Sequence, residues 1–250
     1  MELNKIYNGD CLEVMKDIDD DSINLILTDP PYGTTSCAWD TVIDLDLMWL
    51  QLKRIIKPNG AIVLFGNQPF TSKLIISNIK MFKYCWVWDK IISTGFLNAN
   101  KMPLKGFEDI VVFYKKLPPY NPQKTVGKPF INKRDNPNKE REEKEYLGTK
   151  PKQSSCINKG DRYPRGIIRI SNRDYNPLHP TQKPVALMEY LIKTYTNENE
   201  LVLDFCIGSG TTAIAAINTK RNYIGIELDK KYYDKANKRI YEHQRQIKLF

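Results

Sequence analysis

The sequence predicts an α/β fold, because strand and helix signals alternate along most of its 250 residues. The alternation runs through residues 1–114, stops in residues 115–178 and returns in residues 179–250. In the last stretch, a buried strand leads through a glycine-containing turn into a helix, a pattern typical of ligand-binding α/β sheets. We therefore expect one α/β domain made of two halves, residues 1–114 and residues 179–250, with an insertion between them.

The first half predicts strands at residues 5–7, 23–28 and 61–65, and a late strand pair at 84–88 and 109–114. A short helix is expected at residues 11–16. A longer one is expected at residues 45–56, where apolar residues at positions 45, 49, 52 and 56 follow a helical period. The run Lys57-Pro58-Asn59-Gly60 then ends this helix.

The second half predicts a helix headed by Pro184, a favoured first helical residue, and continuing through residue 195. A strand at residues 201–203, a glycine turn, a helix from residue 211 and a strand at residues 222–226 follow. A terminal helix is expected at residues 230–246. We find no internal repeat.

The insertion, residues 115–178, is rich in proline and carries the excess charge of the chain. It holds 16 Lys and Arg against 7 Asp and Glu, which equals the net charge of +9 for the whole chain. A local basic surface attracts a polyanion. The alternative is a solvated loop with surplus lysine.

Composition excludes several classes of protein. No apolar stretch approaches the roughly 18 residues of a membrane helix, and residues 1–5 show no signal-peptide apolar region. The five cysteines are scattered without a CxxC pair, so the sequence indicates neither a metal site nor a disulfide framework. We expect a cytoplasmic protein, of a prokaryotic cell or a phage-infected host, that does not associate with membranes.

The group Asp29-Pro30-Pro31-Tyr32 directly follows the strand at residues 23–28. It therefore lies at the carboxyl end of a strand, where open α/β sheets bind ligands. The carboxylate and the Pro30 carbonyl can accept the two hydrogens of a ring amino group, and Tyr32 can stack on the ring. The alternative is an ordinary turn, since Pro-Pro breaks regular structure.

The run from Asp204 to Thr212 forms a second constellation. Gly208 and Gly210 permit a tight turn and close backbone approach to a ligand. Glu227, at the end of the next strand, is spaced to accept ribose hydroxyls. The turn lacks the third glycine of a dinucleotide motif and the Lys-Ser/Thr of a phosphate loop. A nucleoside cofactor without a pyrophosphate, S-adenosylmethionine, fits both constellations; a purely structural turn is the alternative.

These residues resemble the amino-group DNA methyltransferases, which modify adenine N6 or cytosine N4. Residues 29–32 look like the family's catalytic motif, residues 204–210 its glycine motif, and Glu227 its ribose-binding acid. Residues 179–184 are similar to the segment at the methionine end of the cofactor, and residues 9–11 to the segment that lines its adenine. The catalytic motif comes first and the cofactor motif last, which is the permuted order of the family's beta group.

The resemblance implies a Rossmann-like methyltransferase fold, with a seven-stranded, mostly parallel sheet, a reversed hairpin at one edge and helices on both faces. Residues 1–114 would be the catalytic half, 115–178 the target-recognition region and 179–250 the cofactor-binding half. The implied catalytic residues are Asp29, Pro30, Pro31 and Tyr32. The implied cofactor contacts are Asp10, Cys11, Asp29, Thr181, Lys183, Asp204, Phe205, Gly208, Ser209, Gly210, Thr211, Thr212 and Glu227.

The implied reaction is transfer of a methyl group from S-adenosylmethionine to a base flipped out of double-stranded DNA. Asp29 favours adenine N6, because cytosine N4 enzymes of the family often carry Ser there; cytosine N4 stays as the alternative. Further alternatives are an RNA or protein acceptor and a non-catalytic DNA-binding protein. No cysteine follows a proline, which argues against cytosine C5 chemistry.

Four arginines of the insertion, Arg162, Arg165, Arg169 and Arg173, are candidates for contacts with phosphates or guanine edges. Each alone also fits an ordinary surface charge. The sequence leaves open the recognition site, the partnership with a cognate restriction endonuclease and the formation of a homodimer.

Overall fold

The computed structural model describes residues 1–33, 41–132, 156–173 and 182–247. The chain divides into two compact units, one made of Met1–Asn121 and Arg165–Phe250 and the other of Pro122–Pro164. The first unit contains the main sheet and all the helices among the described residues. None of these helices is long and apolar enough to cross a membrane.

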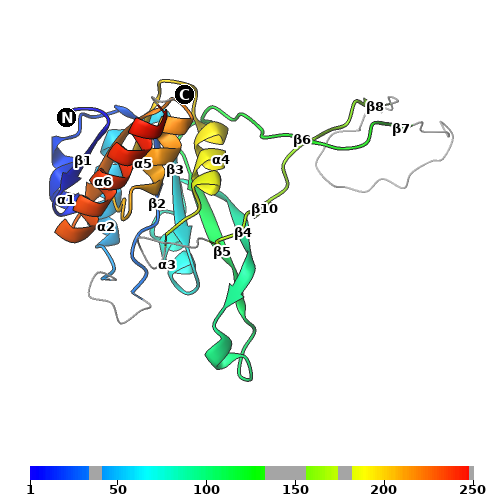
Figure 1. Cartoon of the computed structure of the whole chain (residues 1–250), viewed down its shortest axis with the longest axis horizontal. Helices are drawn as coiled ribbons and strands as arrows, with labels where there is room; N and C mark the ends of the chain where they lie inside the picture. The colour runs from blue at the N-terminus through cyan, green and yellow to red at the C-terminus, as the bar shows by residue number, and fades with distance from the viewer. Residues whose placement is uncertain (34–40, 133–155, 174–181, 248–250) are drawn as a thin grey trace. The chain divides into compact units, whose positions relative to one another are not determined.

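The main sheet has eight strands, and one of them runs against its neighbours (Figure 1). β5 is antiparallel to β3 and to β4, while every other neighbouring pair is parallel. In spatial order the strands are β1 (Lys5–Asn8), β12 (Asn222–Glu227), β11 (Leu201–Asp204), β2 (Ile23–Thr28), β3 (Ile56–Gly66), β5 (Lys105–Phe113), β4 (Phe82–Thr94) and β10 (Ile167–Arg169).

Helices cover both faces of this sheet (Figure 1). One face packs against α4 (Val185–Tyr195), α5 (Thr211–Asn218) and α6 (Lys230–Ile247). The other packs against α1 (Cys11–Val14), η1 (Met15–Asp17), α2 (Leu45–Ile55) and α3 (Phe70–Ser77). Each face has its own hydrophobic core. In β2, Leu25 and Leu27 pack into the core under α4, α5 and α6, the first core, and Ile26 packs into the core on the other face, the second core. Burial on both faces explains why this strand is an unbroken apolar run.

The predicted α/β fold is confirmed, but the main sheet has eight strands and not seven. The additional strand, β10, comes from the region predicted as an insertion. It pairs with β4, and its central residue, Ile168, is buried. One buried residue between exposed neighbours produces no periodic signal. Helix α3 was also not predicted, and residues 56–60 join β3, where the sequence predicts a helix terminator.

The predicted strand pair is confirmed as an antiparallel hairpin that is longer than expected, but it does not form the edge of the sheet, because β10 pairs with the outer side of β4. β4 has 13 residues and β5 has 9. Gly66, the last residue of β3, pairs with Asp109, so residues 105–108 of β5 and the partner residues of β4 extend past the end of β3. Figure 1 shows this extension at the bottom of the view, where η2 (Phe96–Asn98) lies at its end.

The second unit contains two short antiparallel pairs. β6 (Thr125–Val126) pairs with β9 (Asp161–Arg162), and β7 (Phe130–Asn132) pairs with β8 (Cys156–Asn158). The second unit is shorter at both ends than the predicted insertion, residues 115–178. Residues 115–121 stay with the first unit, where the Asn121 side-chain amide donates to the Thr196 carbonyl just after α4, at 3.1 Å. Residues 167–169 also belong to the first unit, because β10 pairs with β4.

Candidate functional site

A cavity of about 660 Å³ opens in the first unit, at the edge where β2, β11 and β12 end. Because these strands are parallel, their carboxyl ends meet at one edge, which is where ligands bind in such sheets. Residues 29–32 after β2 line one part of the wall. Residues 204–206 with Gly208 and Ser209 line another. The two constellations that the sequence predicts therefore face the same space.

The carboxylate of Asp29 is held from two sides. Its Oδ1 accepts a hydrogen bond from the Tyr32 hydroxyl, and its Oδ2 accepts one from Nζ of Lys183. Pro30 is buried, which keeps the turn rigid. The Tyr32 ring stacks on Phe70 of α3, with centroids 5.1 Å apart and planes 29° apart. In this structure Tyr32 therefore contacts both the Asp29 carboxylate and, through Phe70, the hydrophobic core on the face that α3 covers.

Lys183 belongs to a chain of alternating charges that continues into the β4–β5 hairpin. Its ammonium lies 3.2 Å from the Glu108 carboxylate of β5, which is also paired with Lys90 of β4. Only 7% of the Lys183 side chain is exposed, and its Nζ lies 5.0 Å from the centroid of the Phe65 ring. Buried charges require partners. Lys183 satisfies this requirement through two carboxylates and an aromatic face.

The burial of these ionised side chains shifts their pKa values. Burial raises the pKa of Asp29, and although Lys183 opposes this shift, the nearby Glu108 charge adds to it. Burial alone lowers the pKa of Lys183, but the carboxylates of Asp29 and Glu108 outweigh it and raise that pKa. Burial also raises the pKa of Glu108, but Lys183 and Lys90 prevail and lower it.

Glu227, at the carboxyl end of β12, connects two turns of backbone. Its Oε2 accepts a hydrogen bond from the Gly208 amide at 2.8 Å, and its Oε1 accepts one from the Asp229 amide at 2.9 Å. Each carboxylate oxygen has two lone pairs, so both still have capacity for a ligand hydroxyl. Burial raises the pKa of Glu227, and the two amides oppose that rise.

Asp204, at the end of β11, is nearly fully buried and lies behind the glycine turn. It accepts hydrogen bonds from the Thr212 hydroxyl and from the Cys206 amide, the latter at 3.1 Å. Thr28 of β2 also lowers the pKa of this carboxyl, and Oγ1 of Thr28 accepts from the Phe205 amide at 3.1 Å. Burial raises the pKa of Asp204 to about 7 despite these hydrogen bonds.

The turn uses its two glycines for different purposes. Gly208 has a φ of +53° and Gly210 one of +81°, a region that L side chains rarely adopt. A Cβ on Gly210 would lie 3.3 Å from Cβ of Ala236, so this glycine also lets α6 pack closely. Ser209 donates from its hydroxyl to Oε1 of Gln182 at 2.8 Å, which attaches the turn to the segment before α4.

Most residues that the resemblance implies for the cofactor line this one cavity. Gly210 and Thr212 do not: the first contacts α6, and the second is buried against Asp204. Thr181 lies outside the described residues. Lys183 lies at the Asp29 carboxylate. The implied residues on the wall are Asp10, Cys11, Asp29, Pro30, Pro31, Tyr32, Lys183, Asp204, Phe205, Gly208, Ser209, Thr211 and Glu227.

Several wall residues have no clear signal in the sequence. Glu108 reaches the cavity from the β4–β5 hairpin, and its only signal was an acid within a strand of apolar residues. Residues 41–44 contribute from the segment before α2, and Tyr232 contributes from α6. The carboxylates on the wall outnumber the single lysine: they are Asp10, Asp29, Asp44, Glu108, Asp204, Glu227 and Asp229.

The four candidate arginines are divided between the two units. Arg162 belongs to the second unit, where it donates to the Lys128 carbonyl and lies 5.1 Å from the Phe130 ring centroid. Arg165, Arg169 and Arg173 belong to the first unit and are exposed. Arg169 pairs with Asp89 of β4 at 2.9 Å. Within the described residues, no cluster of His, Cys, Asp or Glu is arranged to hold a metal ion.

Comparison with known proteins agrees with this geometry. A family model described as DNA methylase, that of the N6/N4 methyltransferases, matches residues 23–238. The type II methyltransferase M.BglII of Bacillus subtilis is 32% identical over 256 residues, which cover 94% of this chain and 68% of that protein.

Two solved structures have the same fold. The crystal structure of the M1.HpyAVI–SAM complex aligns with a TM-score of 0.62 at 27% identity, covering 94% of this chain and 98% of that one. The cytosine-N4-specific PvuII DNA methyltransferase aligns with a TM-score of 0.66 over 93% and 84% of the two chains, and at 19% identity its likeness concerns the fold alone. Since the family model covers most of the sequence, the chain belongs to the N6/N4 DNA methylase family.

Proposed function

We propose that this protein transfers a methyl group from S-adenosylmethionine to the N6 amino group of adenine in double-stranded DNA. The observation that carries this proposal is the single cavity on which residues 29–32 and the glycine turn both lie. One wall offers acceptors for a ring amino group, and the other offers acceptors for a ribose. A methyl donor and a methyl acceptor bound to these walls would therefore be neighbours, and proximity of this kind lowers the barrier to reaction.

The residues present fit the proposed cofactor. Seven carboxylates and one lysine line the cavity, which favours a ligand with net positive charge. S-adenosylmethionine has such a charge at its sulfonium. Glu227 has lone pairs left for the ribose hydroxyls, and Asp10 and Cys11 lie on the wall where the resemblance implies the adenine. When bound, the cofactor supplies an electrophilic methyl group.

The residues around Asp29 provide the chemistry for the acceptor. An exocyclic amino nitrogen is a weak nucleophile because its lone pair is delocalised into the ring. Hydrogen bonds from the amino group to Asp29 and to the Pro30 carbonyl favour a more tetrahedral nitrogen, a preorganised electrostatic effect. The amino group would replace the Tyr32 hydroxyl at Oδ1, while Lys183 keeps Oδ2 in place. The proton that the nitrogen loses goes to Asp29 or to water.

Tyr32 connects this exchange to base flipping. Its hydroxyl bonds to Asp29 and its ring lies on Phe70 in the present structure. A flipped base that binds Asp29 displaces the hydroxyl, and the released ring is then placed to stack on the base. Stacking on an aromatic side chain contributes roughly 1–3 kcal/mol per base.

The assignment to adenine rests on Asp29, since cytosine N4 enzymes of the family often have Ser at this position. The PvuII enzyme shows that the fold also serves cytosine N4. We propose further that residues 115–178 read the DNA sequence, because this quarter of the chain carries all of its net positive charge.

The test is methyl transfer from labelled S-adenosylmethionine to mixed genomic DNA, with the product nucleosides resolved by mass spectrometry. We expect N6-methyladenine. Production of N4-methylcytosine would retain the mechanism and overturn the base assignment. Cofactor binding without transfer to any DNA, while RNA or protein is methylated, would overturn the substrate.

A further inference from the structure

The end of the β4–β5 hairpin exposes large apolar side chains that no part of the described structure covers. Phe96 is 76% exposed and Leu97 is fully exposed, both in η2 at the end of the hairpin. Further exposed apolar residues line the approach to this end: Ile91, Ile92, Met102 and Phe107. Several large apolar side chains exposed at one end of a hairpin indicate an interaction site.

This apolar end projects from the edge of the sheet that holds the cavity. β4 runs parallel to β10, and it pairs with β5, which is itself antiparallel to β3. The carboxyl end of β4 therefore lies on the same side as the carboxyl ends of β2 and β3, where Asp29 follows β2. Figure 1 shows the hairpin continuing past β3 in that direction.

The base of the hairpin is connected directly to the candidate site. Glu108 of β5 pairs with Lys183, and Lys183 pairs with Asp29. Lys90 of β4, whose ammonium pairs with the Glu108 carboxylate, completes this series of ion pairs. The hairpin is therefore attached to the Asp29 carboxylate through buried ion pairs, and its end extends away from them.

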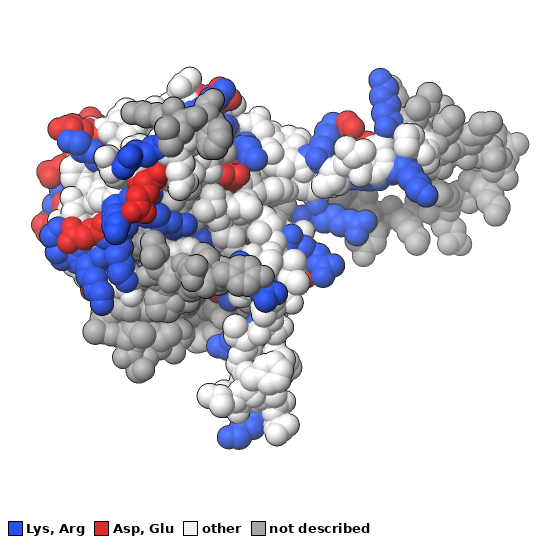
Figure 2. All heavy atoms as spheres, viewed as in Figure 1, with Lys and Arg blue, Asp and Glu red and all other residues white. Residues whose placement is uncertain are grey.

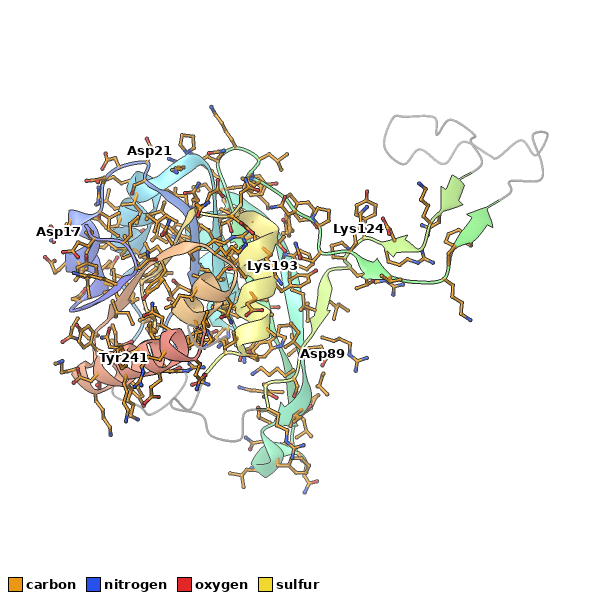
Figure 3. The ribbon with its side chains drawn as sticks, turned by 45° about the horizontal axis from the view of Figure 1, so that its top comes forward. Asp17, Asp21, Asp89, Lys124, Lys193 and Tyr241 are labelled. Atoms are coloured by element: carbon orange, nitrogen blue, oxygen red, sulfur yellow. The ribbon has the colours of Figure 1, made fainter. Side chains whose placement is uncertain are left out.

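The backbone fixes the direction in which the hairpin leaves the sheet. The pairing of β4 with β5 is irregular between Asp89 and Thr94, and Ile91 has a φ of +66°, a rare value for a β-branched residue. The Asp89 carboxylate accepts from the Ile91 amide at 2.9 Å and pairs with Arg169. Figure 3 labels Asp89 at this point. Irregularities of this type re-aim strands beside active sites.

The charge at the end of the hairpin indicates which class of partner it binds. Residues 91–107 contain two lysines, Lys101 and Lys105, and no Asp or Glu, and both lysines are exposed. Figure 2 shows the projecting hairpin as white with blue at its end. An apolar tip flanked by positive charge is complementary to nucleic acid, where lysines meet phosphates and apolar side chains enter between bases. Two copies of the same positive tip would repel one another.

We propose that the β4–β5 hairpin is a DNA wedge, with Phe96 and Leu97 entering the duplex beside the target base and Lys101 and Lys105 contacting phosphates. This proposal rests on the proposed function, since it assumes that the acceptor base lies in duplex DNA. The apolar pair occupies the space that the base leaves when it moves to Asp29. It thereby offsets the few kcal/mol that unstacking a base costs.

The test compares the double variant Phe96→Ala/Leu97→Ala with the intact chain on duplex genomic DNA. We expect the rate of methyl transfer to fall by about tenfold or more, because the cost of unstacking is no longer offset. The affinity for S-adenosylmethionine, measured by calorimetry, and the molar mass, measured by light scattering, should not change. The volume-conserving variant Phe96→Leu/Leu97→Met should keep most of the activity.

The matched control removes two exposed apolar side chains elsewhere, Leu50 of α2 and Ile76 of α3, in the variant Leu50→Ala/Ile76→Ala. It should transfer methyl groups at the rate of the intact chain. Separately, Lys101→Gln/Lys105→Gln should reduce the salt dependence of binding to a labelled duplex by a slope of about 2. This second measurement needs no catalysis.

Two results would overturn the wedge. One is an unchanged rate for Phe96→Ala/Leu97→Ala together with an unchanged salt slope for the lysine variant. The other is a loss of activity accompanied by a halved molar mass, which would make the hairpin an interface between two copies of the chain. Failure of the proposed function is seen separately, because the intact chain itself would then not methylate duplex DNA.

Discussion

The cavity has two carboxylate clusters that the protein stabilises in opposite ways. Asp29 is paired with Lys183, and Glu108 and Lys90 extend the ion pairs into the hairpin. Asp204 and Glu227, on the other side, are held by backbone amides and hydroxyl groups. The first cluster is held by ionised side chains, and the second is held by the dipoles of backbone amides and hydroxyl groups.

This difference matches what each side is proposed to do. A carboxylate that must accept hydrogens from a reacting amino group benefits from a fixed cation that keeps it ionised. A carboxylate that binds hydroxyl groups needs a fixed orientation and free lone pairs, which backbone amides provide at low cost in mobility. The following variants test this division, in order of decreasing effect.

The largest effect is expected for Asp29→Asn. The amide keeps the size of the side chain but loses the charge, so it cannot stabilise the developing positive charge on the amino nitrogen. We expect methyl transfer to fall by about a thousandfold, the scale for loss of one preorganised electrostatic partner. Calorimetric affinity for S-adenosylmethionine should change little. Activity near that of the intact chain would remove Asp29 from the reaction.

The ion pairs around Asp29 can be tested with two variants that are expected to shift the pH dependence of the rate in opposite directions. Lys183 lowers the pKa of Asp29 and Glu108 raises it. If ionised Asp29 is the active form, Lys183→Gln should move the acid limb of the rate–pH profile to higher pH, and Glu108→Gln should move it to lower pH. The profiles are measured with duplex DNA at saturating cofactor.

Lys183→Gln should also destabilise the fold, by about 3 kcal/mol, because it leaves a buried carboxylate unpaired. Thermal unfolding therefore accompanies each profile, and rates are compared below the melting transition of both variants. Acid limbs that move in the same direction, or do not move, would show that the network does not set the ionisation of Asp29.

Glu227→Ala tests the opposite side of the cavity. Loss of a charged acceptor for the ribose hydroxyls should weaken cofactor affinity by about tenfold to a hundredfold, since hydrogen bonds to charged groups contribute roughly 1.5–3 kcal/mol. The maximal rate at saturating cofactor should stay near that of the intact chain. An unchanged dissociation constant, measured by calorimetry, would remove Glu227 from the ribose role.

Apart from these effects on the reaction and on cofactor binding, the last variant concerns folding stability and Asp204. Its pKa is raised to about 7, so the folded state binds a proton that the unfolded state releases near pH 4. Stability therefore decreases as pH rises from 4 to 7, and the whole cost, about 4 kcal/mol as an upper bound, is present above pH 7. Asp204→Asn removes this dependence.

The measurement for Asp204 is the melting temperature of variant and intact chain at several pH values. The difference, Asp204→Asn minus intact chain, should be more positive at pH 8 than at pH 5. A difference that is independent of pH would show that Asp204 titrates as an ordinary carboxylate in the folded protein.

The residues of the candidate site whose place depends on position along a strand could be predicted from the sequence. Asp29, Asp204 and Glu227 each end or follow a buried apolar strand, and parallel strands bring such ends to one edge whatever their order in the chain. Periodicity and position were sufficient for these residues. The same logic identified the helices that begin after the turn and at Pro184.

Glu108 and Lys90 were missed because their role depends on pairing between strands. Glu108 reaches the cavity only through the register of β5 against β4 and β3, in which Glu108 lies opposite Trp88 and directly past the end of the pairing of β5 with β3. Lys183 was assigned to the cofactor, and its contact with Asp29 joins residues 154 positions apart in the chain. Local patterns contain no information on such pairings, nor on β10, whose single buried residue has no periodic neighbours.

The Thr28 hydroxyl connects the two walls of the cavity. It joins the strand that leads to Asp29 with the strand that leads to the glycine turn, through the Phe205 amide and the Asp204 carboxylate. This one side chain therefore adds a link to the backbone pairing of β2 with β11, between the two walls on which acceptor and cofactor are proposed to bind. Its replacement by the isosteric valine would leave the buried Phe205 amide without this acceptor. The rate of methyl transfer in Thr28→Val would thus measure how far the reaction depends on a link that contacts neither wall's ligand.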